Sequence, residues 1–259
     1  MPDQSTAQPV LSQRRGNVLI ITLNRPDVRN AVNRELAYGL AAALDDLDAD
    51  DALSIGILTG AGSGFCSGMD LKAFAAGQTP RHETRGFAGI VQQPPNKPIV
   101  AAVEGFAVAG GLEVALACDL LVVAAGAKLG IPEVKRSLVA AGGALRRLPR
   151  RIPYGIAVEM ALTGDPISAE RGYELGLVNR IAEPGHAVDV ALELAGAIAE
   201  NGPLALAATK QILESQWDWS DEDFWHRQRE ISAPVFVSED AREGAVAFSE
   251  KRAPVWQRR

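Results

Sequence analysis

Short apolar runs punctuated by turn residues dominate the first half of the chain. Four of these runs, residues 17–23, 53–59, 99–103 and 119–124, are rich in Val, Ile, Leu and Ala. The first ends at the turn-forming stretch 24–27, Asn-Arg-Pro-Asp. Runs that are apolar at nearly every position are typical of strands buried on both faces of a parallel sheet. The sequence therefore predicts four buried strands.

Two helices are predicted between these strands. Leucines recur at steps of four, four and three between residues 36 and 47, which places them on one face of a helix. Asn33 stands where an N-cap residue is expected. A shorter helix is expected over residues 111–118. Strands and helices alternate to about residue 130, as in an α/β domain.

Helical segments replace strands after about residue 142. These segments have apolar residues at helical spacing and are separated by prolines. The expected helices are residues 156–162, 169–175, 188–199, 204–214 and 220–230. Ser220, followed by Asp223, resembles an N-capping arrangement at the start of the last of them.

These patterns divide the chain into three parts. Residues 1–16 are expected to form a flexible N-terminal tail, residues 17–200 an α/β core, and residues 201–259 a helical C-terminal region. Three tryptophans and a phenylalanine lie between residues 217 and 225. Their large apolar area suits packing either on the core or on another subunit.

Composition and charge exclude several classes of partner. The 259 residues include 26 Lys and Arg against 32 Asp and Glu, a formal net charge of −6. Such a surface as a whole does not attract nucleic acid or an anionic membrane. The two cysteines suit a reducing compartment, and the polar first segment lacks the apolar core of a signal peptide. We expect a soluble, cytoplasmic protein without nucleic-acid or membrane partners.

Two glutamates are the strongest candidates for chemistry. Glu113 and Glu133 each close a glycine-bearing segment that follows an apolar run. Gly110 opens an apparent helix, whose unpaired N–H groups suit an anion. Two carboxyl groups beside such donors could move a proton while negative charge develops on an oxygen. Glutamates near helix starts also commonly cap helices or pair with arginine, so the pattern alone leaves both interpretations open.

Four motifs in order carry a resemblance to a known family. They are Phe-Cys-Ser-Gly-Met-Asp-Leu at residues 65–71, Lys-Pro-Ile-Val-Ala-Ala-Val-Glu-Gly at 97–105, Gly-Gly-Leu-Glu-Val-Ala-Leu-Ala-Cys-Asp at 110–119 and Gly-Ile-Pro-Glu at 130–133. Together they resemble the crotonase, or enoyl-CoA hydratase/isomerase, superfamily. The resemblance implies an α/β crotonase-like spiral of ββα units. It also implies C-terminal helices that drive assembly of a homotrimer, commonly a dimer of trimers.

The resemblance also implies roles for individual residues. The backbone N–H groups of Ser67 and Gly110 match the oxyanion-hole positions, which would hold the thioester oxygen of an acyl-CoA substrate. Glu113 and Glu133 match the two glutamates of members that hydrate a 2-enoyl-CoA. Glu113 would orient and deprotonate the water, and Glu133 would deliver a proton to the substrate. Burial can produce the different protonation states that this division requires.

Binding of coenzyme A is expected from residues 65–71 and from two further segments that resemble the family, residues 24–31 and 247–252. The resemblance implies contacts from Arg25, Arg29, Cys66, Ser67, Asp70, Leu71 and, from a neighbouring subunit, Lys251. Each cation could equally be a solvated surface residue. Asp70 also stands where it would cap the helix that follows it. Nothing in the sequence requires a metal or redox cofactor. Coenzyme A enters as part of the substrate.

Departures from the family pattern leave the substrate open. Ala140 stands where the family often has proline, and residues 74–92, which help to wall the acyl pocket in relatives, contain few bulky side chains. Residues 65–72, 148–149 and 238–244 look most like the subgroup that contains carnitinyl-CoA dehydratases. The leading interpretation is a reversible 2-enoyl-CoA hydratase. The alternatives are a carnitinyl- or other hydroxyacyl-CoA dehydratase, an enoyl-CoA isomerase, and a non-catalytic trimer that binds acyl-CoA.

Overall fold

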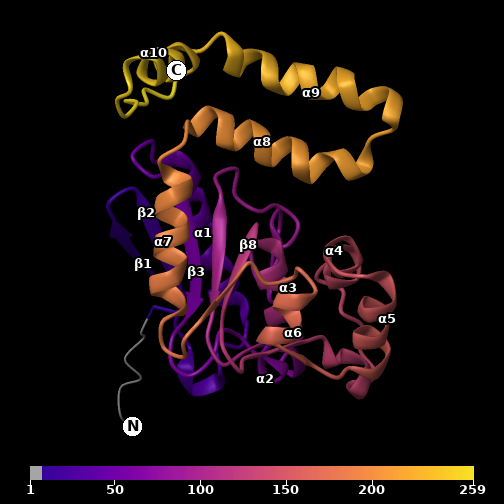
Figure 1. Cartoon of the computed structure of the whole chain (residues 1–259). Helices are drawn as coiled ribbons and strands as arrows, with labels where there is room; N and C mark the ends of the chain where they lie inside the picture. Colours follow the sequence, from indigo (N-terminus) through magenta and orange to yellow (C-terminus); the bar gives the residue numbers. More distant parts are fainter. Residues whose placement is uncertain (1–7) are drawn as a thin grey trace.

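A six-stranded sheet runs through the centre of the protein (Figure 1). In the computed structural model, which describes residues 8–259, its strand order is β1-β2-β3-β6-β8-β11. The strands are β1 (Val10–Arg15), β2 (Val18–Leu23), β3 (Ile55–Gly60), β6 (Ile99–Val103), β8 (Leu120–Ala124) and β11 (Arg180–Ala182). β1 pairs antiparallel with β2, and every other neighbouring pair is parallel. The four predicted strands are confirmed as β2, β3, β6 and β8.

Both faces of this sheet are buried, which explains the continuous apolar runs. Alternate residues of β2 face opposite sides: Leu19 and Ile21 join one core cluster, whereas Val18 and Ile20 join the other. The second cluster is completed by the alanines of α7 (Ala187–Ala199) at positions 187, 191 and 195. Their spacing of four puts three small side chains on one helix face, so the helix can lie close to the sheet.

A three-stranded sheet, order β10-β9-β7, lies beside the large one. Its strands are β7 (Phe106–Val108), β9 (Lys128–Gly130) and β10 (Ile167–Ser168). β6 passes into β7 and then into a helix, and β8 passes into β9 and then into a 3-10 helix. The predicted spiral of ββα units is therefore confirmed, with one strand of each unit in each sheet. A two-stranded ladder joins β4 (Arg81–His82) and β5 (Gly86–Phe87).

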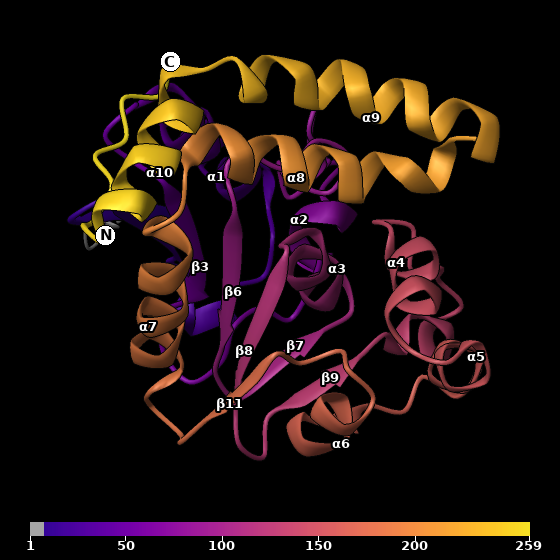
Figure 2. The same cartoon turned by 45° about the horizontal axis from the view of Figure 1, so that its top comes forward.

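The remaining helices cover the sheets and form the C-terminal region (Figure 2). They are α1 (Arg34–Ala49), α2 (Leu71–Ala75), α3 (Gly110–Ala117), α4 (Ala144–Arg151), α5 (Tyr154–Thr163), α6 (Ala169–Glu174), α8 (Pro203–Ser215), α9 (Asp221–Phe236) and α10 (Glu239–Glu250). Three short 3-10 helices are η1 (Pro26–Val28), η2 (Pro132–Arg136) and η3 (Gln216–Asp218). The predicted caps are confirmed: Asn33 accepts the Leu36 N–H at 3.0 Å, and Ser220 accepts the Asp223 N–H at 3.1 Å.

A buried lysine of α8 links the C-terminal region to the core. Lys210 of α8 is buried and donates to an oxygen of Asp119 at 2.9 Å and to the carbonyl of Lys97 at 3.0 Å. Both acceptors lie at ends of strands in the large sheet. α9 runs beside α8 and has no buried side chain (Figures 1 and 2). Trp217 and Trp225 are more than half exposed, so the aromatic group of this region does not pack into the core of its own chain.

The structure corrects one expectation about elements and shows two helices that the sequence does not predict. A flexible tail over residues 1–16 is wrong for residues 10–15, which form β1; residues 1–7 lie outside the described part of the chain. β1 has almost entirely exposed side chains and is held by backbone hydrogen bonds, so it leaves no apolar pattern. The sequence also gives no prediction of α4, which is rich in arginine, or of α10.

Within residues 8–259, no single helix is long and apolar enough to cross a membrane. The pair α7 and α8 passes that test only when taken together, across a bend of 108°. Both cysteines, Cys66 and Cys118, are free and buried.

Candidate active site

Three loops meet beside the C-terminal ends of β7 and β9 and build the site. Cys66 bridges to Ala107 of β7, and Val108 at the end of β7 pairs with Gly130 at the end of β9. The chain that follows each of these residues therefore emerges next to the other two. One loop continues to Met69, the second enters α3 with Glu113, and the third enters η2 with Glu133.

Glycines allow these loops to lie in backbone contact. A Cβ on Gly68 would lie 2.9 Å from the Gly110 nitrogen, and a Cβ on Gly111 would overlap the Cys66 carbonyl. A Cβ on Gly110 would lie 2.6 Å from the ring of Phe87. Real side chains do not approach so closely, and only glycine avoids the overlap without moving the chain. The glycines of both motifs thus bring the loop at residues 66–69 against the N-terminus of α3.

Two backbone N–H groups remain without an acceptor at this contact. Gly110 is the first residue of α3, and no carbonyl among residues 8–259 accepts its N–H. The same holds for Met69: in its bridge to Val32, the hydrogen bonds run from Val32 to Gly68 and from Asp70 to Val32. This pattern points the N–H of Met69 away from Val32. The site therefore offers two fixed donors on adjoining backbone segments.

The structure corrects the expectation for Ser67. Its N–H donates to the carbonyl of Arg29 at 3.0 Å and is not free to hold a substrate oxygen. Met69, two residues further along, has the free N–H instead. Contacts with Arg29 and Val32 determine which of the two N–H groups is free. These residues are far away in sequence, so the motif does not reveal the result.

Ala109 shows that the Gly110 donor is held under strain. It precedes α3 with φ +53° and ψ −134°, a conformation that glycine adopts readily and alanine does not. Backbone strain of this kind costs about 1–3 kcal/mol and persists only where the surroundings enforce it. Here its N–H donates to the Gly130 carbonyl at 2.9 Å, which fixes the turn.

Glu113 is buried beneath a glycine turn. Its carboxylate accepts the N–H of Ala144 at 3.2 Å, and a Cβ on Gly142 would lie 2.8 Å from its Cδ. Burial raises the pKa of Glu113, while the N–H groups of Ala144 and Gly142 and the charge of Arg147 oppose the rise. Gly142 therefore packs directly against the Glu113 carboxylate, and even a methyl group at this position would displace it.

Glu133 lies in η2, near enough to Glu113 for the charge of that carboxylate to act on it. Burial raises its pKa to about 7, and the neighbouring charge of Glu113 adds to the effect. Its Oε2 is buried, and nothing within residues 8–259 donates to it. A buried polar atom without a partner in its own chain is uncommon in folded proteins. Glu133 therefore holds its proton more tightly than an ordinary glutamate.

The raised pKa of Glu133 predicts a pH effect on stability. Because the folded state binds this proton more tightly than the unfolded state, the free energy of unfolding falls as pH rises from about 4.5 through 7. Between pH 5 and pH 8 we expect the wild type to lose about 2 kcal/mol relative to Glu133→Gln. Urea unfolding of both proteins at equal concentration measures this difference. An unchanged difference across the range would contradict the raised pKa.

Two of the residues expected to bind coenzyme A, Asp70 and Arg25, form an ion pair with each other. Asp70 caps α2 as predicted, accepting the N–H groups of Lys72 and Ala73, and it also pairs with Arg25 at 3.0 Å. The Arg25 guanidinium also donates to the carbonyl of Ala31. Arg25 thus ties its own segment to the cap of α2.

Three other candidates differ in exposure. Cys66 is fully buried and its thiol donates to the carbonyl of Asn30 at 3.1 Å, so a contact of Cys66 with coenzyme A stays a prediction that would involve its backbone. Arg29 is exposed, and Leu71 is half exposed at the start of α2. Contacts of these two with coenzyme A stay predictions.

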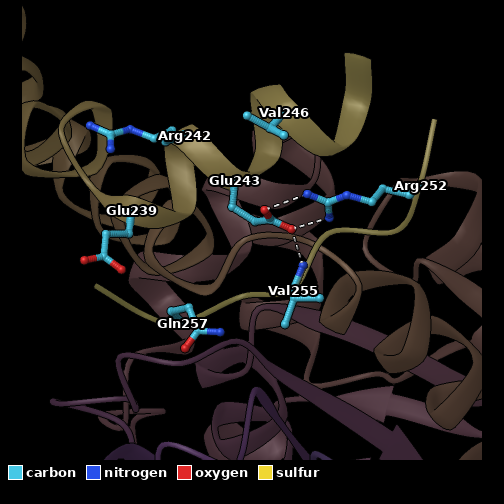
Figure 3. A pocket seen from close by; sticks show the side chains of 7 residues that line it. All are labelled: Glu239, Arg242, Glu243, Val246, Arg252, Val255 and Gln257. Carbon is cyan, nitrogen blue, oxygen red and sulfur yellow. Dashed lines mark hydrogen bonds and ion pairs between the residues drawn. The ribbon is translucent and has the colours of Figure 1, made fainter. Parts of the chain in front are cut away.

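Lys251 ends α10, which lies apart from α3 in both views (Figures 1 and 2). Beside it, α10 and the final segment border a hollow of about 480 Å³ (Figure 3). Glu243 fills part of this hollow and holds Arg252 at 2.6 and 3.0 Å. The hollow is therefore a feature of the C-terminal region and contains none of the residues of the paired glutamate site.

Sequence reasoning missed three contributors to the site. Besides Met69, these are Arg147, whose charge acts on Glu113, and Asn30, whose buried amide donates to the carbonyls of Ala61 and Gly64. The left-handed conformation of Asn30 is a recognisable habit of asparagine, but the sequence does not say which carbonyls it would meet. Among the described residues, no group of three His, Cys, Asp or Glu side chains could hold a metal ion.

The spiral of ββα units, with two carboxyl groups and two free backbone donors in its loops, defines an enzyme of the crotonase fold. The family model described as enoyl-CoA hydratase/isomerase matches residues 13–259. The chain belongs to this family.

Three relatives illustrate the similarity. The chain is 42% identical over 258 residues to the enoyl-CoA hydratase EchA19 of Mycobacterium tuberculosis, covering 96% of each. It is 40% identical over 252 residues to a carnitinyl-CoA dehydratase of Salmonella arizonae, covering 94% of this chain and 96% of the relative. The crystal structure of the enoyl-CoA hydratase EchA1 from Mycobacterium marinum superimposes with a TM-score of 0.96 at 56% identity, over 98% of this chain and 100% of that one.

Proposed function

We propose that the protein catalyses the reversible hydration of a 2-enoyl-CoA thioester to a 3-hydroxyacyl-CoA. The observation that carries the proposal is the pairing of Glu113 and Glu133, both with raised pKa values, beside the free N–H groups of Met69 and Gly110. Neither carboxyl group would be needed to bind a neutral thioester, and burying each is costly.

The two N–H groups hold the thioester oxygen. As water adds to Cβ, the electrons of the double bond move toward the carbonyl, and negative charge gathers on that oxygen as an enolate. Donors that are already in place stabilise this charge without reorganising during the reaction. Their advantage is greatest in a site that excludes bulk water.

The two glutamates move the protons. Ionised Glu113 takes a proton from the water whose oxygen bonds to Cβ, and protonated Glu133 gives its proton to Cα. The overall reaction adds one water across the double bond, and proton exchange resets the two carboxyl groups. Three backbone N–H groups favour the charged form of Glu113, whereas the pKa of Glu133 of about 7 keeps much of it protonated at neutral pH. This difference supports the assignment of base and acid.

The proposal includes binding and assembly. Exposed Arg29 and, from a neighbouring copy, Lys251 would meet the phosphates of coenzyme A. The unpartnered apolar side chains of the C-terminal region, such as Trp225 and Phe236, would be covered in a homotrimer or a dimer of trimers. We propose that the enzyme works in the cytoplasm. The reaction itself calls for no metal or redox cofactor.

A second candidate is dehydration of carnitinyl-CoA or another hydroxyacyl-CoA. It is favoured by the relatives at 38–40% identity that are named carnitinyl-CoA dehydratase. The same two glutamates would serve, because dehydration is the reverse of hydration and uses each group in the opposite protonation state.

Crotonyl-CoA tests the proposal directly. We expect the purified protein to remove the absorbance of the conjugated thioester and to form 3-hydroxybutyryl-CoA. Carnitinyl-CoA and 3-enoyl-CoA, followed under the same conditions, separate the dehydratase and the isomerase. Binding of CoA thioesters without conversion of crotonyl-CoA would exclude the hydratase assignment for this substrate and move the search to the second candidate.

A further inference from the structure

Phe87 touches the residue that carries an oxyanion donor. Its ring lies against the Cα of Gly110, so that a Cβ there would be 2.6 Å from Cζ and 2.7 Å from Cε1. The ring is partly buried and packs on the main core cluster. It belongs to β5, in a stretch where bulky side chains are few. Phe87 is therefore a large side chain next to the reacting end of any thioester bound at Gly110.

The backbone around Phe87 is fixed by unusual conformations. Gly86, Ala88 and Gly89 have φ values of +72°, +55° and +75°. Ala88 is fully buried in this conformation, which non-glycine residues adopt uncommonly. Gly89 lies so close to α1 that a Cβ would overlap the carbonyl of Ala37. We name residues 86–89 the Phe87 turn.

Contacts on both sides hold this turn in place. On one side, buried Arg85 pairs with Asp45 of α1 at 2.6 Å. On the other, Arg147 of α4 donates to the carbonyl of Val91 at 2.7 Å. Within the turn, the N–H of Ala88 donates to the carbonyl of Pro80 at 3.0 Å. The Phe87 ring is thus a rigid wall, because neither the turn nor its flanks can move without breaking these contacts.

We infer that Phe87 selects thioesters whose Cα carries no substituent, through contact of its ring with the acyl group held at Gly110. This inference rests on the proposed function and deepens it. An oxygen that accepts the Gly110 N–H places Cα only two bonds further on. A ring packed on the Gly110 Cα lies within reach of that carbon, and a methyl group on Cα meets a wall that cannot retreat. The substrate class is then the 2-enoyl-CoA thioester with hydrogen at C2.

The size of the effect follows from the discrimination of apolar pockets. One methyl or methylene group too many changes kcat/KM by roughly 10–200-fold. We therefore expect the wild type to prefer crotonyl-CoA over 2-methylcrotonyl-CoA by at least about tenfold. In Phe87→Ala the ratio of the two kcat/KM values should fall about tenfold or more, because the lost ring opens space for the methyl group.

Two further variants make the test specific. Phe87→Leu keeps apolar bulk with less risk to folding and should lower the ratio by a smaller factor. Phe106→Ala is the matched control, since Phe106 is also a partly buried phenylalanine but starts β7, at the end away from Gly110. It should leave the ratio within about twofold of wild type. An unchanged ratio in folded Phe87→Ala and Phe87→Leu would overturn the inference.

Binding separates this inference from the proposed function. Calorimetric titration with butyryl-CoA and 2-methylbutyryl-CoA, which cannot be hydrated, reports the same discrimination without chemistry. If no variant converts crotonyl-CoA but the binding ratio still changes at position 87, the hydratase proposal fails and the role of Phe87 stands. If the binding ratio is also the same in wild type and Phe87→Ala, the role of Phe87 is excluded.

Discussion

Glu133→Gln is expected to lower kcat for hydration of crotonyl-CoA by about 10²–10⁴-fold, the usual contribution of a positioned general acid. Glutamine keeps the size and shape of the side chain but cannot give a proton to Cα. Because the uncharged thioester needs no carboxyl group for binding, affinity for butyryl-CoA should change by less than about threefold. Steady-state kinetics and calorimetric titration of the same preparations measure the two effects.

Glu113→Gln is the companion variant. It removes the proposed base, and the double variant should be little worse than the poorer single one, because the two groups act on one reaction. The wild-type kcat/KM for hydration should fall as pH rises above about 7, where Glu133 loses its proton. That limb should disappear from the residual activity of Glu133→Gln. Full activity of Glu133→Gln would reject the assignment of this residue.

Gly110→Ala should lower kcat/KM by about 10²–10³-fold, a loss comparable to removal of one oxyanion-hole donor. The added methyl group would lie 2.6 Å from the Phe87 ring, and the backbone at residue 110 would have to move to relieve the overlap. The N–H that we propose holds the thioester oxygen would move with it. The kinetics of crotonyl-CoA hydration measure this loss.

A matched control is Gly196→Ala. Gly196 lies in α7, where a Cβ would meet no atom within 4 Å, so its replacement should leave activity unchanged and favour the helix. Combining Gly110→Ala with Phe87→Ala removes the ring atoms that the new methyl group would overlap, leaves the Gly68 Cα at 3.4 Å, and should restore part of the activity. Activity of Gly110→Ala within twofold of wild type would show that the donor does not depend on this close contact.

The sequence predicts those parts of the fold that rest on burial. The buried strands β2, β3, β6 and β8 and the leucine face of α1 leave continuous or periodic apolar patterns that can be read in one dimension. β1 leaves none, because an edge strand with exposed side chains is specified by its partner's backbone. The arginine-rich helix α4 also leaves no apolar pattern, because only two of its residues are buried.

Part of the candidate site could be predicted from the sequence, but the availability of its backbone donors could not. Glu113, Glu133 and Gly110 stand in motifs, so the sequence points to them directly. Whether Ser67 or Met69 has a free N–H depends on the pairing of their loop with Arg29 and Val32, a tertiary contact that no local pattern encodes. Resemblance to a family supplies residue positions, whereas the hydrogen bonds of the fold decide which atoms are available.

The strained turn at Ala109 bears on any attempt to engineer a hardier form of this enzyme. A search for stabilising substitutions would single out Ala109→Gly, because glycine occupies that region of φ and ψ without a steric penalty. The same substitution would make the main chain at residue 109 more flexible. Because this residue directly precedes Gly110, the orientation of the Gly110 N–H would then vary more. Thermal robustness and catalytic precision therefore compete at this one residue.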